Sequence, residues 1–162
     1  MSSTFSALHL RNPGPMLADT LKTWGGASDM WIFGYASLIW RPEFDAAEQQ
    51  PARVYGWHRA LEMRSRVNRG TPECPGLVLR EMPTGVYDPK WLTCRTAHGN
   101  TRALAFTLSH RSPAHIGGLE DAQMIEIQRC ANGRFGSTLD YLLETARSLH
   151  GCGIRDRDVE RL

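Results

Sequence analysis

The residues Gly34-Tyr35-Ala36-Ser37-Leu38 form the part of this sequence best suited to bind an anionic group. They follow Met30-Trp31-Ile32-Phe33, an apolar run typical of a buried strand. A strand that ends in small residues lets successive backbone N–H groups point into one concavity, which binds a carboxylate or a phosphate without a charged side chain. Ser37 adds a hydroxyl group and Tyr35 an aromatic wall. The alternative is an ordinary tight turn, because the sequence has neither the G-x-G-x-x-G nor the Walker A nucleotide pattern.

A carboxylate with apolar neighbours, Glu81, is the second chemical candidate. It stands beside Met82, close to Val86, and it comes shortly after the apolar run Leu77-Val78-Leu79. Desolvation raises the pKa of a carboxyl group, and such a glutamate can accept and return a proton near neutral pH. The alternative is a solvated glutamate beside a turn.

Other side chains that could take part in catalysis or bind a metal are better explained by structural roles. His58 lies between Trp57 and Arg59 in an expected strand and fits a packed or hydrogen-bonded residue better than a base. Cys94 and His98 have the spacing of half a zinc site, but no second pair has ligand spacing, so no metal site is predicted. Ser37 lacks the G-x-S-x-G elbow of hydrolase nucleophiles. The arginines within residues 64–69 fit a solvated face.

Composition and charge describe one globular domain. Of the 162 residues 41% are hydrophobic and 22% are charged, a mixture that excludes disordered and fibrous chains. Lys and Arg (19) nearly balance Asp and Glu (17), so neither a nucleic-acid nor a membrane partner is predicted. No apolar run approaches the roughly 18 residues of a spanning helix, and the first thirty residues lack signal-peptide features.

The four cysteines indicate a reducing compartment. They stand singly, without a C-x-x-C pair, at positions Cys74, Cys94, Cys130 and Cys152. Scattered cysteines in a chain without an export signal are typical of reduced, buried thiols. We therefore expect a cytoplasmic protein.

The hydrophobic pattern predicts an α+β domain over residues 30–162, preceded by an N-terminal extension over residues 1–29. In the extension, Leu17, Leu21 and Trp24 share one face of a short helix that Gly25-Gly26 ends. Strands are expected at 30–33, 77–79 and 102–108, and a longer one over 52–64, bent at Gly56.

The C-terminal third changes to a helical period. One helix is expected over 119–131 and a second from Ser137 or Thr138 to a C′ glycine at Gly151. The second helix has an apolar stripe of Leu139, Leu142, Leu143, Ala146 and Leu149. Tyr141 falls nearly opposite most of that stripe, so it is predicted to be more than core filler, with a plain exposed tyrosine as the alternative.

Five segments, taken in order, resemble one family. They read W-I-F-G-Y-A-S-L-I-W (31–40), G-W-H-R (56–59), R-G-T-P-E-C-P-G (69–76), R-E-M-P-T-G-V-Y-D-P-K-W (80–91) and G-R-F-G-S-T-L-D-Y-L (133–142). Together they are similar to the ChaC family, the glutathione-specific γ-glutamylcyclotransferases. Several long segments in family order are far more specific than any single motif.

The resemblance implies a small mixed β-barrel with surrounding helices, and a reaction on glutathione. In that reaction the glutamyl α-amine attacks its own side-chain carbonyl, which yields 5-oxoproline and Cys-Gly. The nucleophile is already tethered in the substrate, so the family needs no metal or cofactor. The oligomeric state is not predicted.

The resemblance also assigns roles to residues. Glu81 becomes the general base and acid. Tyr141 contacts the substrate, and Arg69 is a candidate partner for a substrate carboxylate, with a structural arginine as the stronger alternative. The substrate-binding loop comprises Gly34, Tyr35, Ala36, Ser37, Leu38 and Ile39.

Two departures from the family pattern carry their own expectations. Ala36 replaces a glycine, and a Cβ there would cost about 1–2 kcal/mol if the position needed a positive φ. Leu79 runs directly into Arg80, where relatives have about one further strand and one further helix. The alternative function is therefore a catalytically inactive, shortened member that acts as a binding or regulatory protein.

Overall fold

The computed structural model describes residues 12–79 and 86–161, so the candidate base Glu81 lies outside the described residues. Helices and strands are mixed along the chain, which confirms the α+β class. The elements are α1 (Pro13–Trp24), β1 (Trp31–Ile32), α2 (Ser37–Trp40), β2 (Met63–Ser65), β3 (Gly76–Val78), β4 (Tyr87–Thr96), β5 (Gly99–Leu108), α3 (Asp121–Cys130), β6 (Asn132–Gly133), β7 (Gly136–Ser137), α4 (Thr138–Gly151) and α5 (Arg157–Arg161).

The described strands pair as open sheets. β4 and β5 form a long antiparallel hairpin, and β1 adds to β5 in parallel, with Trp31 opposite Ala103. β2 pairs antiparallel with β3, and β6 with β7. Among the described residues these pairings make sheets of three, two and two strands.

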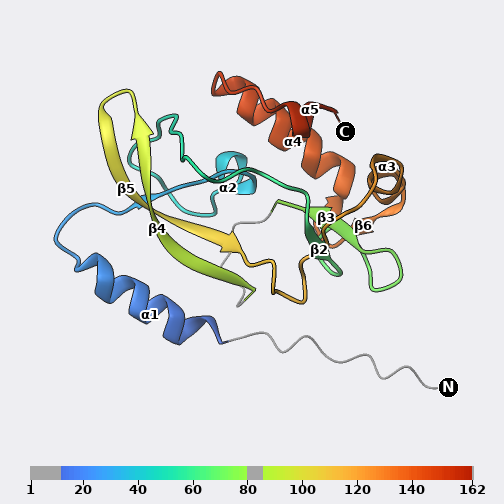
Figure 1. Cartoon of the computed structure of the whole chain (residues 1–162), viewed down its shortest axis with the longest axis horizontal. Helices are drawn as coiled ribbons and strands as arrows, with labels where there is room; N and C mark the ends of the chain where they lie inside the picture. The colour runs from blue at the N-terminus through green and yellow to red at the C-terminus, as the bar shows by residue number, and fades with distance from the viewer. Residues whose placement is uncertain (1–11, 80–85, 162) are drawn as a thin grey trace.

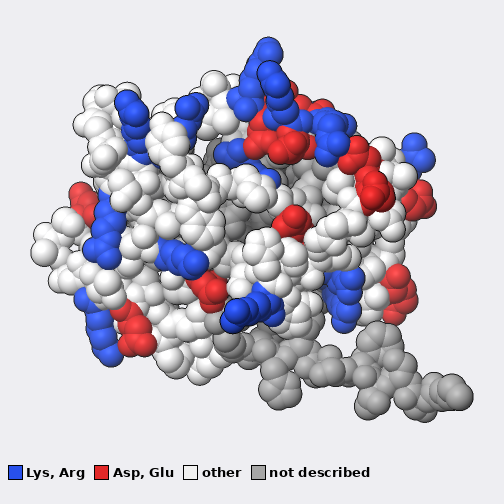
Figure 2. All heavy atoms as spheres, viewed as in Figure 1, with Lys and Arg blue, Asp and Glu red and all other residues white. Residues whose placement is uncertain are grey.

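The core lies between the hairpin, the short sheets and α4. Figure 1 shows α1 beneath the β4–β5 hairpin and α2 between that hairpin and α4. Side chains of β2, β3, β5 and α4 supply the centre of the core, among them Met63, Leu77, Val78, Leu104 and Leu142. Figure 2 shows both signs of charge interspersed on the viewed face, as the net charge of +2 leads one to expect. In the described part of the chain, no helix combines the length and apolarity that crossing a bilayer requires.

The ends of the predicted helices are largely as expected. Gly25 ends α1 with φ of 82°, a left-handed conformation that suits a residue without Cβ. Ser137 caps α4, because its Oγ accepts a hydrogen bond of 2.9 Å from the N–H of Asp140. Gly151 is instead the last helical residue, and Gly153, with φ of 71°, takes the left-handed position.

The buried face of α4 differs from the predicted stripe. Leu139 and Leu143 are 41% and 43% exposed, whereas Tyr141 is only 3% exposed. The face that packs inward comprises Thr138, Tyr141, Leu142, Thr145 and Leu149. Two threonines can lie there because each hydroxyl donates to a backbone carbonyl, of Arg69 at 3.0 Å and of Tyr141 at 2.8 Å. The prediction that Tyr141 faces away from the core was therefore wrong.

The long strand predicted over 52–64 is also wrong. Gly56 has φ of 79° and lies in a turn, and only Arg53 pairs with the sheet, through Arg95. Regular pairing resumes at Met63, in β2. The intervening residues run along a cavity that is described below.

The prediction of four reduced, buried cysteines is only partly correct. Cys74 and Cys130 form a disulfide that ties the turn before β3 to the end of α3. Cys94 and Cys152 are free, the first buried and the second exposed. The two bridged cysteines are 56 residues apart in sequence, so only the tertiary structure brings them together.

Candidate active site

The predicted binding loop is a loop only in its first half, because residues 34–36 connect β1 to α2 whereas Ser37, Leu38 and Ile39 belong to α2. The segment is held at both ends. The N–H of Phe33 donates to the Leu104 carbonyl at 2.8 Å, which extends the pairing of β1 with β5. At the other end, the N–H of Ile39 donates to the Ala36 carbonyl at 3.0 Å. A Cβ at Gly34 would lie 3.2 Å from Cβ of Leu38, so the small residue lets the loop turn tightly back onto α2.

Ala36 fits the loop without the cost considered above. Its φ is −148°, which is not a left-handed conformation, and its side chain is completely buried. The replacement of the family glycine therefore carries no positive-φ penalty in this chain.

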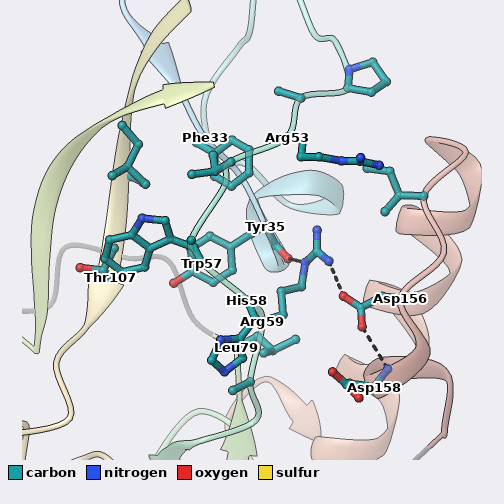
Figure 3. A pocket seen from close by; sticks show the side chains of 18 of the residues that line it. Phe33, Tyr35, Arg53, Trp57, His58, Arg59, Leu79, Thr107, Asp156 and Asp158 are labelled. Carbon is teal, nitrogen blue, oxygen red and sulfur yellow. Dashed lines mark hydrogen bonds and ion pairs between the residues drawn. The ribbon is translucent and has the colours of Figure 1, made fainter. Parts of the chain in front are cut away.

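Tyr35 is anchored through both its side chain and its backbone, and Figure 3 shows the backbone contact with Arg59. Its hydroxyl donates to the carbonyl of Phe106 in β5 at 2.6 Å. Its own carbonyl accepts from Nε of Arg59 at 2.7 Å. Arg59 also forms an ion pair with Asp156, and both side chains are mostly buried. Three segments that are distant in sequence thus meet at Arg59: the loop with Tyr35, the extended segment with Arg59 itself, and the residue before α5, Asp156.

Trp40 and Tyr141 join the loop to α4. Their rings meet edge to face, with centroids 6.0 Å apart. Nε1 of Trp40 donates to the hydroxyl of Thr145 at 3.3 Å. The guanidinium of Arg69 lies over both rings, 5.3 Å from the centroid of Tyr141, and donates to the Ser137 carbonyl at 3.3 Å. Arg69 is buried, and these contacts are those of a structural arginine.

The hydroxyl of Tyr141 donates to the carbonyl of Leu79. Both residues are buried, so the bond fixes the end of the β3 segment against α4 in a place that water does not reach. Helix α4 therefore contacts both the segment that contains Trp40 and the residue Leu79.

A cavity of about 920 Å³ opens beside this assembly. Its size falls within the range of small-ligand sites. Figure 3 shows Tyr35, Trp57 and Arg59 around it, with Asp156 and Asp158 on the α5 side. Leu79 also lines it. The wall carries charged groups of both signs, which suits a zwitterionic ligand.

The predicted site residues lie in two groups. Tyr35 lines the cavity, whereas the other described members of the predicted set are not among its lining residues. Those members are Gly34, Ala36, Ser37, Leu38, Ile39 and Tyr141, of which Ala36, Leu38 and Tyr141 are buried. Sequence reasoning missed the pair Arg59–Asp156. No local signal marks it, because its members are 97 residues apart.

Two further titratable side chains have clear environments. Burial raises the pKa of the Cys94 thiol, so this cysteine is not an activated nucleophile. His58 is exposed and lines the cavity, so of the two predicted alternatives, a packed or a hydrogen-bonded residue, the structure contradicts the first.

Comparison with known proteins gives a consistent result. A family model described as ChaC-like protein matches residues 30–86. The glutathione-specific γ-glutamylcyclotransferase of Escherichia coli K12 is 28% identical over 176 residues, covering 90% of this chain and 76% of its own. Glutathione-specific γ-glutamylcyclotransferase 1 of Homo sapiens is 27% identical, covering 83% and 76%. Over the matched residues the chain is similar to the ChaC family, as the sequence led us to expect.

A solved structure has a fold similar to that of this chain. A yeast γ-glutamylcyclotransferase specific to glutathione superposes with a TM-score of 0.66 at 15% identity. The match covers 79% of this chain and 90% of the yeast chain. The two proteins therefore share a fold.

The chain lacks residues that its bacterial relative has. Their alignment runs over 176 positions, more than the 162 residues of this chain, although it includes only 90% of them. The alignment must therefore contain gaps on the side of this chain. This agrees with the expectation that the chain is shortened relative to the family.

Replacing Tyr141 with Phe tests the junction between α4 and Leu79. We expect the free energy of unfolding to fall by about 1–3 kcal/mol, because the buried Leu79 carbonyl loses its donor. Urea unfolding followed by circular dichroism measures the loss. The matched control is Tyr55→Phe, at a tyrosine that is 64% exposed, where we expect a change within about 0.5 kcal/mol. Equal stability of the two variants would contradict the assignment.

Proposed function

We propose that this chain cleaves the γ-glutamyl amide of glutathione and releases 5-oxoproline and Cys-Gly. The curated relatives from E. coli and human carry the name glutathione-specific γ-glutamylcyclotransferase. The observation that carries most weight is the anchored loop of residues 33–40, which places Tyr35 in the wall of a ligand-sized cavity.

The reaction is an internal transfer. The α-nitrogen of the glutamyl group forms a bond to its own γ-carbonyl carbon, and the amide bond from that carbon to the cysteine nitrogen breaks. The α-nitrogen gives up two protons, one when the ammonium group becomes the attacking amine and one when the lactam N–H forms. The cysteine nitrogen takes up two protons and leaves as the ammonium group of Cys-Gly. A protein that folds the substrate into this geometry gains effective molarities on the order of 10⁵ M or more.

In this proposal, the backbone of Gly34, Tyr35 and Ala36, continued by Ser37–Ile39, binds the glutamyl end of the substrate. Backbone N–H donors in that position would also stabilise the oxyanion that develops on the attacked carbonyl. Arg59 keeps the donors in place, because it holds the Tyr35 carbonyl. Tyr141 supports the site through its bond to Leu79 and its packing on Trp40.

Glu81 is the proposed general base and acid. It matches the glutamate of the family segment and stands two residues after Leu79, which lines the cavity. One carboxylate can take the proton from the ammonium group and return it to the leaving amine. The proposal includes a cytoplasmic location, as expected from the sequence.

Incubation with glutathione tests the function. We expect 5-oxoproline and Cys-Gly in equal amounts, measured by mass spectrometry. N-acetylglutathione is the matched control substrate, because its blocked amine cannot attack, and we expect no cleavage. Cleavage of the acetylated substrate would show hydrolysis instead of cyclisation. Absence of turnover in a folded sample that still binds glutathione would favour the inactive, shortened member.

A further inference from the structure

Three potential metal ligands that the proposed reaction does not use meet in the wall of the cavity. They are the carboxylate of Glu62 and the imidazoles of His110 and His115. One ligand atom from each lies within 4.8 Å of the other two. Nδ1 of His110 is 3.0 Å from Nε2 of His115, and that Nε2 is 3.2 Å from Oε2 of Glu62.

The backbone positions these side chains in advance. The N–H of Ile116 donates to the Glu62 carbonyl at 2.7 Å, and the N–H of Arg64 donates to the Ala114 carbonyl at 2.9 Å. Within residues 109–115, two serines brace the turn through hydrogen bonds to its backbone N–H groups. The cluster therefore rests on paired backbone, which keeps the cost of ordering the ligands low.

Hydrogen bonds alone do not explain why these three side chains lie so close together. Nε2 of His115 carries either one hydrogen or one lone pair, directed along the ring plane. It nevertheless has two partners, Nδ1 of His110 and the carboxylate of Glu62, at hydrogen-bond distance. A cation at the centre would use a lone pair from each of the three atoms at once.

The distances and the donor set fit a transition metal. Two ligands of a tetrahedral zinc site, each with a bond of about 2.0–2.1 Å, lie about 3.3 Å apart. The two contacts of 3.0 and 3.2 Å are close to that separation. Two imidazoles and one carboxylate also form a ligand set that zinc uses when its fourth position stays open.

We propose that Glu62, His110 and His115 bind a divalent transition-metal ion, with Zn²⁺ as the best fit. The metal ties the 109–116 loop to the residue before β2. All three ligands line the cavity, so the open coordination position lies at its wall and takes water or an anionic ligand group. The inference is independent of the proposed function, because binding of the metal is measured without turnover.

Calorimetric titration of the metal-free full chain with ZnCl₂ tests the proposal. We expect one Zn²⁺ per chain, and at least tenfold weaker binding in each of His110→Ala and His115→Ala. His150→Ala is the matched control, at an exposed histidine of α4, and it retains wild-type affinity. Glu62→Gln, which keeps the shape of the side chain, provides a third ligand variant in case a histidine variant fails to fold.

Absorption of the Co²⁺-loaded chain identifies the ligands. We expect a spectrum of nitrogen and oxygen ligation, without a thiolate charge-transfer band. Such a band would overturn the proposal, because the metal would then be bound by Cys94 or Cys152. Substoichiometric binding, or wild-type affinity in both histidine variants, would overturn it as well.

Discussion

Glu81→Gln is expected to abolish the release of 5-oxoproline from glutathione. The amide has nearly the shape of the carboxylate but cannot accept the proton of the substrate ammonium group. General acid–base catalysis contributes about 10²–10⁴-fold to a rate, so we expect kcat to fall by at least about 100-fold. Glutathione binding changes little, because the variant retains the loop that is proposed to bind the glutamyl end.

The matched control for this variant is Glu73→Gln, at an exposed glutamate in the turn before β3. We expect wild-type rates there. Circular dichroism of both variants confirms that each is folded. Product formation at the wild-type rate in Glu81→Gln would show that another group is the base, even if the chain does cleave glutathione.

The elements that could be predicted from the sequence are those with strong local signals. The start of α4 was predicted correctly because Ser137 caps it through a side-chain bond three residues ahead. Gly25 ends α1 for an equally local reason. The loop of residues 33–40 was found because a short apolar strand precedes small residues.

Elements that depend on distant partners were missed. β4 begins with Tyr87-Asp88-Pro89, which reads as a turn. Pro89 is tolerated there because β4 pairs with β5 and with no other strand among the described residues, so the proline belongs to an edge. The disulfide between Cys74 and Cys130 was missed for a related reason, because no spacing rule connects two residues so far apart in the chain.

The inward face of α4 shows a third kind of limit. Counting apolar residues placed Leu139 and Leu143 in the core, but both are half exposed. The buried face contains Thr138 and Thr145, whose hydroxyls find backbone carbonyls. A hydrophobic period does not reveal such partners, and for the same reason it could not place Tyr141 against Leu79.

Arg59→Met is expected to be the most destabilising single change near the cavity. Methionine keeps most of the aliphatic stem but removes the charge. Asp156, whose side chain is 15% exposed, then remains as an unpaired carboxylate, and the Tyr35 carbonyl loses its donor. Removing one member of a buried ion pair costs about 3–5 kcal/mol. Chemical denaturation measures the loss, and Arg157→Met, at an exposed arginine, is the control.

A second variant separates the two roles of Arg59. Arg59→Lys retains a positive charge beside Asp156, but a lysine presents one compact ammonium group in place of the rigid fork that contacts both partners. We therefore expect it to recover part of the stability that Arg59→Met loses, while glutathione cleavage stays impaired because Tyr35 is no longer held. If Arg59→Lys regained full activity, the contact with the Tyr35 carbonyl would be irrelevant to the site. If Arg59→Met were as stable as Arg157→Met, the ion pair would not hold the loop at all.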